Sequence, residues 1–367
     1  MNWKTTFFTE LRRFFSNPAV VFTVFGGVII YSLLYPLPYD HQLPRELNVA
    51  IVDHDDSQQS RAFTRMLDAT PQLRVKEMLG QESEASQRLA SRDIEGVIVI
   101  PQHFYRDLLL GKSPVVSVGG DASFFLVYGT IAEGAVAAGS TLGAQVKVTK
   151  AMMHDTPQPL AEKQYTPFSL NMVPVFNPTV GYGDYVVPGV FMLILQQTLL
   201  IAAGMLQAGS QENSKRSLFA RTTLLFAIYS VMSMYYLGGS LSLNDVNRLA
   251  EPLSLAIIMV PFLLATIGAG TLLGSAIKRP EIITLTVLLS SMPLLFSSGF
   301  VWPVSALPDW LHWLAQLSPS TATIQATIQL NQMGATLQSQ QGFILQLWTL
   351  ALIYLGVSFT LMKKHKR

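Results

Sequence analysis

The sequence contains no cysteine and comparatively little charge. None of its 367 residues is Cys, which excludes disulfide bonds, thiolate metal sites and cysteine nucleophiles. Only 13% of the residues are Asp, Glu, Lys or Arg, whereas typical soluble domains carry roughly 25%. Half of the residues are hydrophobic. A chain so poor in charge and so rich in apolar residues is not expected to be an ordinary soluble domain.

Catalytic and metal-binding patterns are also missing. The six histidines show no zinc-ligand spacing, and no serine nucleophile elbow is present. Gly111-Lys112-Ser113 matches the end of a phosphate loop, but the glycine that this motif requires five residues earlier is replaced by Arg106. Asp53, Asp55 and Asp56 resemble a metal or phosphoryl site, yet their place after an apolar strand favours a turn that caps the next helix. We therefore expect no covalent chemistry, no cofactor and no metal.

Long apolar segments are what the sequence does have. A helix needs roughly 20 apolar residues to cross the hydrocarbon core of a bilayer. None of the six candidate segments contains Asp, Glu, Lys or Arg. They predict an α-helical integral membrane protein with six transmembrane helices, and the lack of ionisable groups argues against transport coupled to protons or ions. The segments are residues 19–34, 186–207, 222–241, 252–277, 282–301 and 343–362.

A polar insert separates the first span, residues 18–35, from the other five in 186–367. Residues 36–185 hold 12 basic and 17 acidic residues, a net charge of −5. Strand patterns alternate with helix patterns, which predicts a small α/β domain with a mixed sheet. Strands are expected at 47–53, 72–78, 94–100 and 114–118, and helices at 57–69, 81–91, 102–110 and 122–153.

The distribution of basic residues predicts the orientation in the membrane. Twelve Lys and Arg lie before the first span, in the loops after the second and fourth, and after the sixth. The loops 242–251 and 302–341 carry only Arg248. By the positive-inside rule, both termini are cytoplasmic and the insert is extracytoplasmic. We expect a multi-pass protein of a bacterial inner membrane, with an uncleaved first span.

Residues 1–17 form a predicted amphipathic helix. Trp3, Phe7, Phe8, Phe14 and Phe15 recur at helical spacing, with charged residues on the other face. Such a helix can lie in the cytoplasmic membrane interface. It can equally pack against the protein's own spans, and the pattern does not separate these alternatives.

Polar residues within the membrane half have two interpretations each. The segment 209–221 is a short, basic loop that either only marks the cytoplasmic side or forms a helix that docks onto a partner. Gln196, Gln197 and Thr198 lie within the second span, where polar side chains either bond between helices or face a transport pathway.

Residues 296–319 predict a re-entrant element that enters the outer leaflet and turns back. Gly299, Pro303 and Pro308 interrupt any spanning helix, and Trp302 and Trp310 suit the membrane interface. Non-helical backbone at membrane depth is tolerated where protein covers it. The element is therefore predicted to lie at a subunit interface or along a pathway.

Several of these features, in this order, resemble the ABC-2 type exporter permeases that carry a large extracytoplasmic domain after the first span. They are the helix 2–16, the insert beginning LNVAIVDHDDS, Asn177-Pro178 before Val187-Pro188-Gly189, the stretch SSGFVWPVSALPDWL followed by Leu317-Ser318-Pro319, and Gly334 before the last span. The resemblance implies a permease that works with separate cytoplasmic ATPases, as a dimer of permeases with two ATPases. Some such systems also use a periplasmic adaptor and an outer-membrane duct.

One segment departs from the family's pattern. The loop after the second span of such permeases carries an acidic Arg-Glu-rich stretch and Gly-Thr, whereas this chain has residues 211–216, QENSKR, without Gly-Thr. We still expect this loop to be the ATPase-coupling element. Its predicted contacts are the apolar anchors Leu218 and Phe219 with the polar flanks Glu212, Lys215 and Arg216.

The leading hypothesis is the permease subunit of an ATP-driven exporter for amphipathic, lipid-like or drug-like cargo. The chain itself is not expected to be an enzyme. Expected partners are cytoplasmic ABC ATPase subunits, a second permease in a homodimer or heterodimer, an adaptor and membrane lipid, but no nucleic acid. The alternatives are a membrane-anchored sensor or receptor whose insert binds a ligand, and an ion-coupled transporter.

Overall fold

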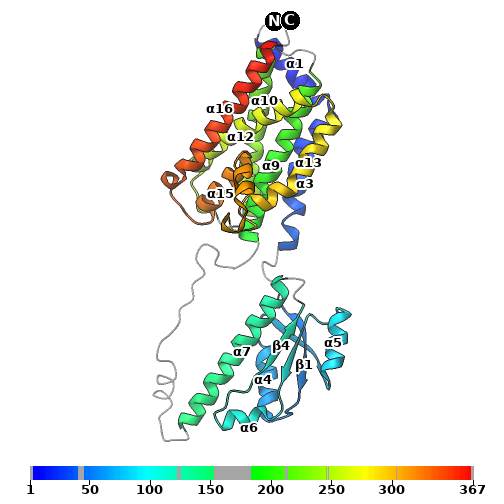
Figure 1. Ribbon diagram of the computed structural model, residues 1–367, viewed down its shortest axis with the longest axis vertical. Coiled ribbons are helices and arrows are strands. Elements are labelled where there is room, and N and C mark those ends of the chain that lie inside the picture. The colour runs from blue at the N-terminus through cyan, green and yellow to red at the C-terminus, as the bar shows by residue number, and fades with distance from the viewer. Residues whose placement is uncertain are drawn as a thin grey trace. The chain divides into compact units, whose positions relative to one another are not determined.

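The computed structural model describes residues 3–39, 45–121, 125–152, 183–210, 214–244, 246, 248–302 and 304–364. The chain divides into two compact units (Figure 1). A helical unit comprises Met1–Asp40 and Pro174–Arg367, and a second unit comprises His41–Val173.

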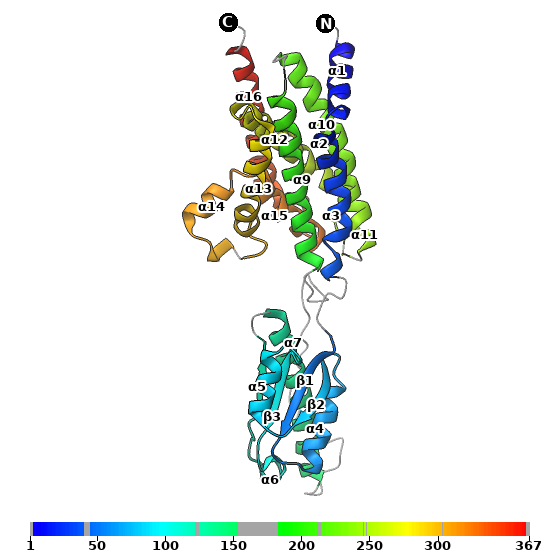
Figure 2. The ribbon, with the colours of Figure 1, turned by 90° about the vertical axis from the view of Figure 1, so that its right-hand side faces the viewer.

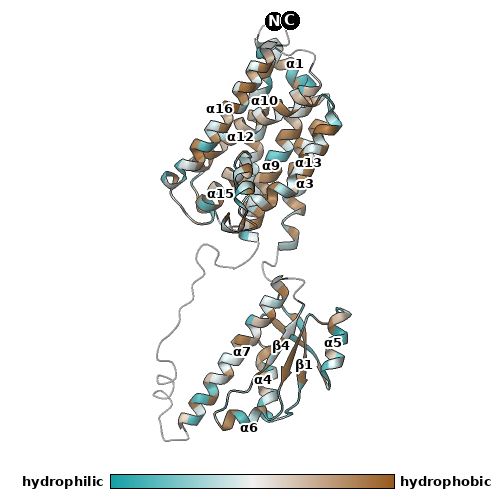
Figure 3. Ribbon diagram, viewed as in Figure 1, coloured by the Kyte–Doolittle hydropathy of each residue, from teal (hydrophilic) through white to brown (hydrophobic). Residues whose placement is uncertain are grey.

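Six helices of the helical unit are long and apolar enough to cross a membrane, which confirms the predicted number. Hydrophobic residues predominate along them in Figure 3. The candidate spans are Pro18–Tyr39, Val186–Ala208, Lys215–Leu243, Pro252–Ala276, Pro280–Ser297 and Leu337–Met362.

Some spans are built from several helical segments, and shorter helices lie before and between them. In chain order the elements are α1 (Trp3–Phe15), α2 (Pro18–Val21), the π-helix η1 (Phe22–Gly27), α3 (Val28–Leu34), the 3₁₀ turn η2 (Leu37–Tyr39), α9 (Gly183–Ala208), α10 (Lys215–Met234), the π-helix η3 (Tyr235–Ser240), α11 (Leu241–Leu243), α12 (Pro252–Ala276), α13 (Pro280–Ser297), the 3₁₀ turn η4 (Val304–Ala306), α14 (Asp309–Ala315), α15 (Pro319–Asn331), the 3₁₀ turn η5 (Leu337–Gln340) and α16 (Gln341–Lys364).

The second span, α9, is the most buried of the six and packs against α10, α12, α13 and α15. Small residues let α12 approach it closely. A Cβ atom at Gly270 would lie 2.8 Å from the Cβ of Ala203, and one at Gly274 would collide with the carbonyl oxygen of Gly204. Close approach through glycines is a common way for helices to associate in a membrane, where no hydrophobic force drives them together.

The first and third spans are joined by hydrogen bonds near their π-helical segments. The Tyr236 hydroxyl of η3 donates to the Val28 carbonyl oxygen at 2.9 Å. The hydroxyls of Ser32 and Tyr235 lie 2.8 Å apart. Figure 2 shows α3 of the first span beside α10 and α11 of the third. Both tyrosines belong to η3, the π segment between α10 and α11, where the π-helical turn alters the register of the side chains.

The segment between the fifth and sixth spans contains a buried helix that the sequence did not predict. The predicted outer loop 302–341 includes α15, whose 13 residues extend about 20 Å at about 1.5 Å per residue. That length is less than the roughly 30 Å of a bilayer core, yet nearly every residue of α15 is buried. Hydroxyls explain this burial, because Thr323 and Thr327 bond to carbonyl oxygens four residues earlier in the same helix.

The second unit is the predicted α/β domain with a mixed four-stranded sheet. The strand order is β2-β1-β3-β4, with β1 parallel to β2 and β3, and β4 antiparallel to β3. In chain order the elements are β1 (Leu47–Asp53), α4 (Gln58–Asp68), β2 (Leu73–Leu79), α5 (Glu82–Ala90), β3 (Gly96–Ile100), α6 (Phe104–Leu109), β4 (Ser117–Gly120) and α7 (Phe125–Met152).

The central strand β1 is buried on both faces, as its uninterrupted apolar run indicates. On one face Val49 and Ile51 pack in a core with α4, α6 and α7. On the other face Ala50 and Val52 pack against α5 and its flanking residues. The result is a three-layer domain, visible in Figure 1 as helices on both sides of the sheet.

Candidate functional site

A buried polar cluster joins α1 to the start of α10. Glu10 of α1 and Arg221 of α10 are 4% and 1% exposed. The Arg221 guanidinium donates from Nε to Glu10 Oε2 at 3.1 Å and from Nη2 to Glu10 Oε1 at 3.2 Å. Its Nη1 donates to Gln207 Oε1 of α9 at 2.6 Å. Together with Ser210 and Ser217, these three residues form what we call the polar junction.

The two serines complete the polar junction. The Ser217 hydroxyl donates to Glu10 Oε1, and the Ser210 hydroxyl accepts from Arg221 Nη2 at 3.2 Å. The planar guanidinium thereby bonds to groups from α1, from the end of α9 and from the following segment at the same time. The junction fixes the N-terminal helix to the second and third spans.

Electrostatics of the junction depend on the pairing of its charges. Burial by itself would raise the pKa of Glu10, but hydrogen bonds and charge from Arg221, with the Ser217 hydroxyl and Arg13, hold it below its ordinary value. Burial and repulsion from Arg221 lower the pKa of Arg13, and Glu10 partly opposes this shift. Removal of one partner of such a buried pair costs about 3–5 kcal/mol, because the other charge is left uncompensated.

The N-terminal helix shows features of both alternatives left open by the sequence. Thr6, Glu10 and Phe14, spaced four residues apart, are buried within the helical unit. Phe8 and Phe15 are exposed, with 64% and 57% of their surface accessible. The helix therefore packs on the protein's own spans with one face and leaves an aromatic face uncovered.

The predicted coupling segment is largely helical. α10 begins at Lys215, after Ser214 accepts a hydrogen bond from the Ser217 N–H as an N-cap. Residues 215–221 therefore belong to a helix and not to a loop. Lys215 and Arg216 are exposed, whereas Glu212 lies outside the described residues.

The two predicted apolar anchors have different environments. Leu218 is 1% exposed, so the expectation that it lies on the surface is wrong: it faces the helical unit, as Ser217 and Arg221 do. Phe219 is 55% exposed, and its ring centroid lies 5.1 Å from that of Trp3 in α1. Trp3 and Phe219, with Lys215 and Arg216, form an exposed aromatic and basic surface beside the polar junction, which we call the α1–α10 surface.

Sequence reasoning named neither Glu10 nor Arg221 as a site residue. Both lie outside the six apolar segments of the sequence. One signal was present: Glu10 is the only acidic residue among residues 1–39, and it lies on a helix otherwise rich in aromatic and basic residues. A single acidic residue on such a helix, in register with the buried Thr6 and Phe14, indicates a partner.

The polar residues in the middle of α9 are buried, and they differ in their bonding. Gln196 Oε1 accepts from the Ser320 N–H at 2.6 Å, and Gln196 Nε2 donates to the Ser318 hydroxyl at 2.9 Å. Gln196 thereby caps the amino end of α15. The Thr198 hydroxyl bonds back to the Ile194 carbonyl oxygen at 2.8 Å. In the described part of the chain, neither amide atom of buried Gln197 has a hydrogen-bond partner.

The predicted re-entrant element 296–319 contains the turn after α13, η4 and α14. Gly299 has a φ of +83°, and a Cβ there would lie 2.6 Å from Val304 Cγ2, so glycine is required. Gln325 of α15 donates to the Ser298 carbonyl oxygen at 2.8 Å and ties this turn to the buried helix.

The other residues of this element lie mostly on the surface. Trp302 and Trp310 are 56% and 69% exposed. Pro308 precedes α14 as its N-cap residue, and Pro303 lies outside the described residues.

A groove of about 490 Å³ opens between the third and fourth spans. We call it the membrane groove; α10, η3 and α12 line it with mostly apolar side chains. Arg248 also lines it, and its guanidinium donates to the Gly238 carbonyl oxygen at 2.8 Å and to the Ser242 hydroxyl at 3.1 Å. Within the described ranges, Nδ2 of buried Asn331, another lining residue, has no hydrogen-bond partner. The groove therefore combines a long apolar wall with polar donors.

The acidic segment of the insert is a turn, as its sequence position suggests. Asp53 Oδ1 accepts from the N–H groups of Asp55 and Asp56 at 3.0 and 3.1 Å. Ser57 then begins α4 with a reciprocal capping box with Ser60. Among the residues that the structure describes, no group of three or more His, Cys, Asp or Glu is arranged to hold a metal ion.

Glu10→Gln should change how stability depends on pH. The folded-state pKa of Glu10 lies below its ordinary value of 4.5, so the carboxylate stabilises the fold above that pH and the stabilisation is lost as pH falls through the folded-state pKa. We expect the thermal midpoint of the detergent-purified protein to decrease as the pH is lowered through this acidic range. In Glu10→Gln, the part of this decrease that comes from protonation of Glu10 should be absent. Glu281→Gln, at an exposed position, is the matched control. Equal pH profiles for both variants would contradict the prediction.

Comparison with known proteins agrees with this architecture. The family model for the ABC-2 family transporter protein matches residues 18–362. The linearmycin resistance permease protein LnrN of Bacillus subtilis (strain 168) is 25% identical over 358 residues, which cover 89% of this chain and 90% of that protein. No solved structure matches the chain. Since the family model covers nearly the whole chain, the protein belongs to the ABC-2 family of transporter proteins and is a multi-pass ABC transporter permease.

Proposed function

We propose that the chain is the permease subunit of an ATP-driven exporter for amphipathic cargo. In this proposal it hydrolyses no ATP and is driven by a cytoplasmic ATPase that binds the α1–α10 surface. The observation that carries the proposal is the polar junction, which fixes α1, α9 and α10 to one another directly beside an exposed aromatic and basic surface.

The polar junction suits the transmission of force. A buried ion pair with several hydrogen bonds is costly to break, so displacement of α1 is transferred to Arg221 and hence to α10. Because Arg221 also bonds to Gln207, α9 takes part in the same displacement. An ATPase that closes on nucleotide and pushes on Phe219, Lys215 or Arg216 would thus move two spans together.

The membrane groove supports an amphipathic cargo. Its volume falls within the roughly 300–1,000 Å³ typical of ligand sites. The apolar wall suits an acyl or other hydrophobic part, and the donors of Arg248 and Asn331 suit acceptor groups on the same molecule. The name of the Bacillus subtilis relative describes resistance to linearmycin, which favours export of a drug-like compound here too.

A second permease is the further partner that we propose. α13 exposes a row of large apolar side chains, and α14 exposes Trp310 and Trp313. Bilayer lipid or another permease would cover these side chains. Because such exporters contain two permeases, we propose that a second permease covers part of the surface formed by α13 and α14. An adaptor remains an additional proposed partner. Membership of a transporter family and the uncharged middle of the spans favour this function over a receptor or an ion-coupled transporter.

The orientation can be tested with single cysteines, because the chain has none of its own. In this proposal Ser83 of α5 and Ser305 of η4 are extracytoplasmic, and Lys278 is cytoplasmic; all three are exposed. We expect Ser83→Cys and Ser305→Cys to react with a membrane-impermeant maleimide in intact spheroplasts, and Lys278→Cys to react only after lysis. Labelling of Lys278→Cys in intact cells would reverse the proposed topology.

ATPase binding should depend on Phe219 and not on Phe8. We expect Phe219→Ala to reduce the amount of co-purifying ATPase by about tenfold, the change produced by losing about 1.4 kcal/mol at an interface. Phe8→Ala is the matched control, since Phe8 is also an exposed aromatic residue but lies outside the α1–α10 surface. The purified chain alone should hydrolyse no ATP. Undiminished ATPase binding by Phe219→Ala would place the coupling surface elsewhere.

Export should depend on the membrane groove and on the outer element. We propose that Gly299, Trp302, Pro303, Pro308 and Trp310 line the outer end of the pathway, beside Gln196, Gln197 and Thr198. Arg248→Gln and Trp310→Ala should each reduce cargo efflux from proteoliposomes that contain the ATPase, with ATPase binding unchanged. Trp348→Ala on α16 is the control for loss of an exposed tryptophan. Equal efflux from all three variants, at equal protein amounts, would contradict both assignments.

A further inference from the structure

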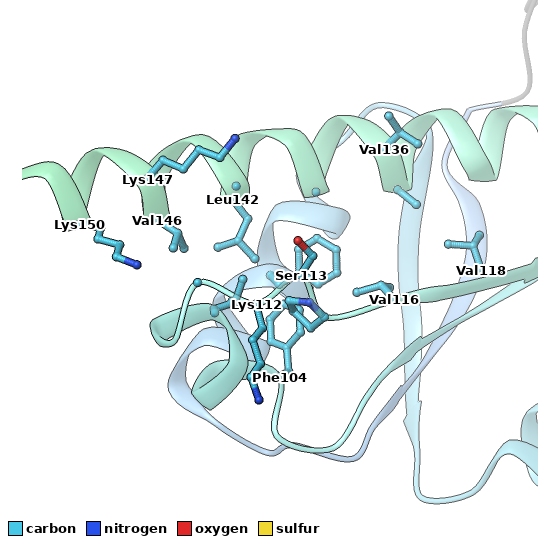
Figure 4. Close-up of a pocket in the computed structure, with 17 residues that line it drawn as sticks. Phe104, Lys112, Ser113, Val116, Val118, Val136, Leu142, Val146, Lys147 and Lys150 are labelled. Atoms are coloured by element: carbon cyan, nitrogen blue, oxygen red, sulfur yellow. The ribbon is translucent and has the colours of Figure 1, made fainter. Parts of the chain in front are cut away.

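The α/β unit contains a second groove, beneath its long helix α7. This groove, which we call the insert groove, has a volume of about 590 Å³ and lies between α7, α4, α6 and the segment that leads into β4 (Figure 4). Phe63 and Phe104 form part of its floor, with ring centroids 5.9 Å apart. Its remaining lining is mostly aliphatic, so the groove offers an apolar surface that water wets poorly.

Glycines create the insert groove. Where α7 packs tightly on the domain, at Gly134, a Cβ atom would lie 2.8 Å from Leu73 Cγ. Further along the helix, a Cβ at Gly139 or Gly143 would meet no atom within 4 Å, and both residues line the groove. Glycine within a helix costs about 1 kcal/mol relative to alanine. Close packing does not account for this cost at Gly139 and Gly143, and the absence of side chains at these two positions keeps the groove open.

The charge around the insert groove is of one sign. Lys112, Lys147 and Lys150 line it, and among the residues that the structure describes no Asp or Glu does. Figure 4 shows Lys147 and Lys150 on the last turns of α7 and Lys112 on the segment after α6, whereas Val136 and Val118 lie toward the other end. The Lys112 side chain points away from α7 in this view, so the three lysines surround this end from different sides. The insert as a whole is acidic, with 12 basic and 17 acidic residues. The three lysines around the groove are therefore positively charged within a domain whose net charge is negative.

A second cavity borders the last turns of α7 on another side. A smaller cavity of about 200 Å³ shares Leu108, Leu142, Val146 and Lys150 with the insert groove. Two cavities therefore border the C-terminal part of α7. A chain-like ligand could displace it slightly without disturbing the sheet, which packs against Ile131 and Ala135 nearer the start of the helix.

From these observations we propose that the insert groove binds a single-chain anionic amphiphile. The apolar chain lies along Phe63, Phe104 and the glycine face of α7, and the anionic head lies at the end that carries Lys112, Lys147 and Lys150. A carboxylate and a phosphate are both suitable heads, since lysine binds either as a compact positive charge. The site is separate from the membrane groove and does not depend on the proposed export function.

The test is photo-crosslinking of the full-length protein in nanodiscs of neutral lipid. The probe is a long-chain fatty acid with a diazirine in its chain, and the matched neutral probe is the corresponding alcohol. We expect the acid to label peptides from the segments 104–118 and 135–150, and the alcohol to label them much less. Competition with unlabelled fatty acid and with a lysophosphatidic acid distinguishes the two heads. Displacement by either supports the proposal, whereas displacement by neither overturns it.

Two kinds of variant make the result specific. Gly139→Leu with Gly143→Leu places side chains in the groove at positions where an added Cβ meets no atom within 4 Å. The double variant should reduce labelling by about tenfold or more, because the chain loses its apolar contact area. Gly129→Leu is the matched control. It adds the same side chain to α7 outside the groove, at a position where no atom lies within 4 Å of an added Cβ. Replacement of all three lysines by glutamine should abolish the preference for acid over alcohol.

Several outcomes would overturn the proposal. They are equal labelling of the wild type and the filled variant, labelling confined to the spanning helices, equal labelling by acid and alcohol, and labelling equally reduced in Gly129→Leu. Thermal midpoints of all variants identify any that fail to fold. Should the filled variant fail to fold, the lysine variant and the competition experiment decide the question. If another protein or a segment of this chain occupied the groove, the probe would not label it, which also counts against the proposal.

Discussion

The absence of water in a bilayer core constrains this fold more than any other factor. Backbone groups there must bond within helices, and each buried polar side chain needs a partner inside the protein. Gln196 satisfies the free amino end of α15, and Tyr236 bonds to the backbone of the first span. Outside the first span, Glu10 of α1 likewise provides a partner for buried Arg221. These contacts lie between elements that are distant in sequence, so the same polar groups that are costly to bury determine which helices are neighbours.

The number of spans could be predicted because length and hydropathy are local properties of the sequence. The α/β class of the insert could also be predicted, since alternating strand and helix patterns are local too. α15 could not. Its serines, threonines and glutamines are typical of a loop, and it is buried only because hydroxyls bond to their own helix and because neighbouring spans cover it.

The candidate site could be predicted only in part. The exposed Lys215, Arg216 and Phe219 were identified because a basic segment beside a span has a recognisable composition. The Glu10–Arg221 pair was not, since the two residues are 211 positions apart and no periodic pattern connects them. Leu218 was expected to contact a partner because the segment 209–221 was interpreted as a loop or a docking helix separate from the third span, which was expected to begin at residue 222. Once a helix begins at Lys215, its periodicity turns Ser217, Leu218 and Arg221 inward.

α9 makes contact with both ends of the proposed transport machinery. Gln207 belongs to the polar junction, and Gln196 caps α15 in the other half of the unit. The two residues are eleven positions apart, about 16 Å of helix at about 1.5 Å per residue, and no proline interrupts this stretch. The segment can therefore act as a rigid rod. Rotation of its Gln207 end about the helix axis reorients the side chain of Gln196 by the same angle, and the amino end of α15 must follow or lose its cap.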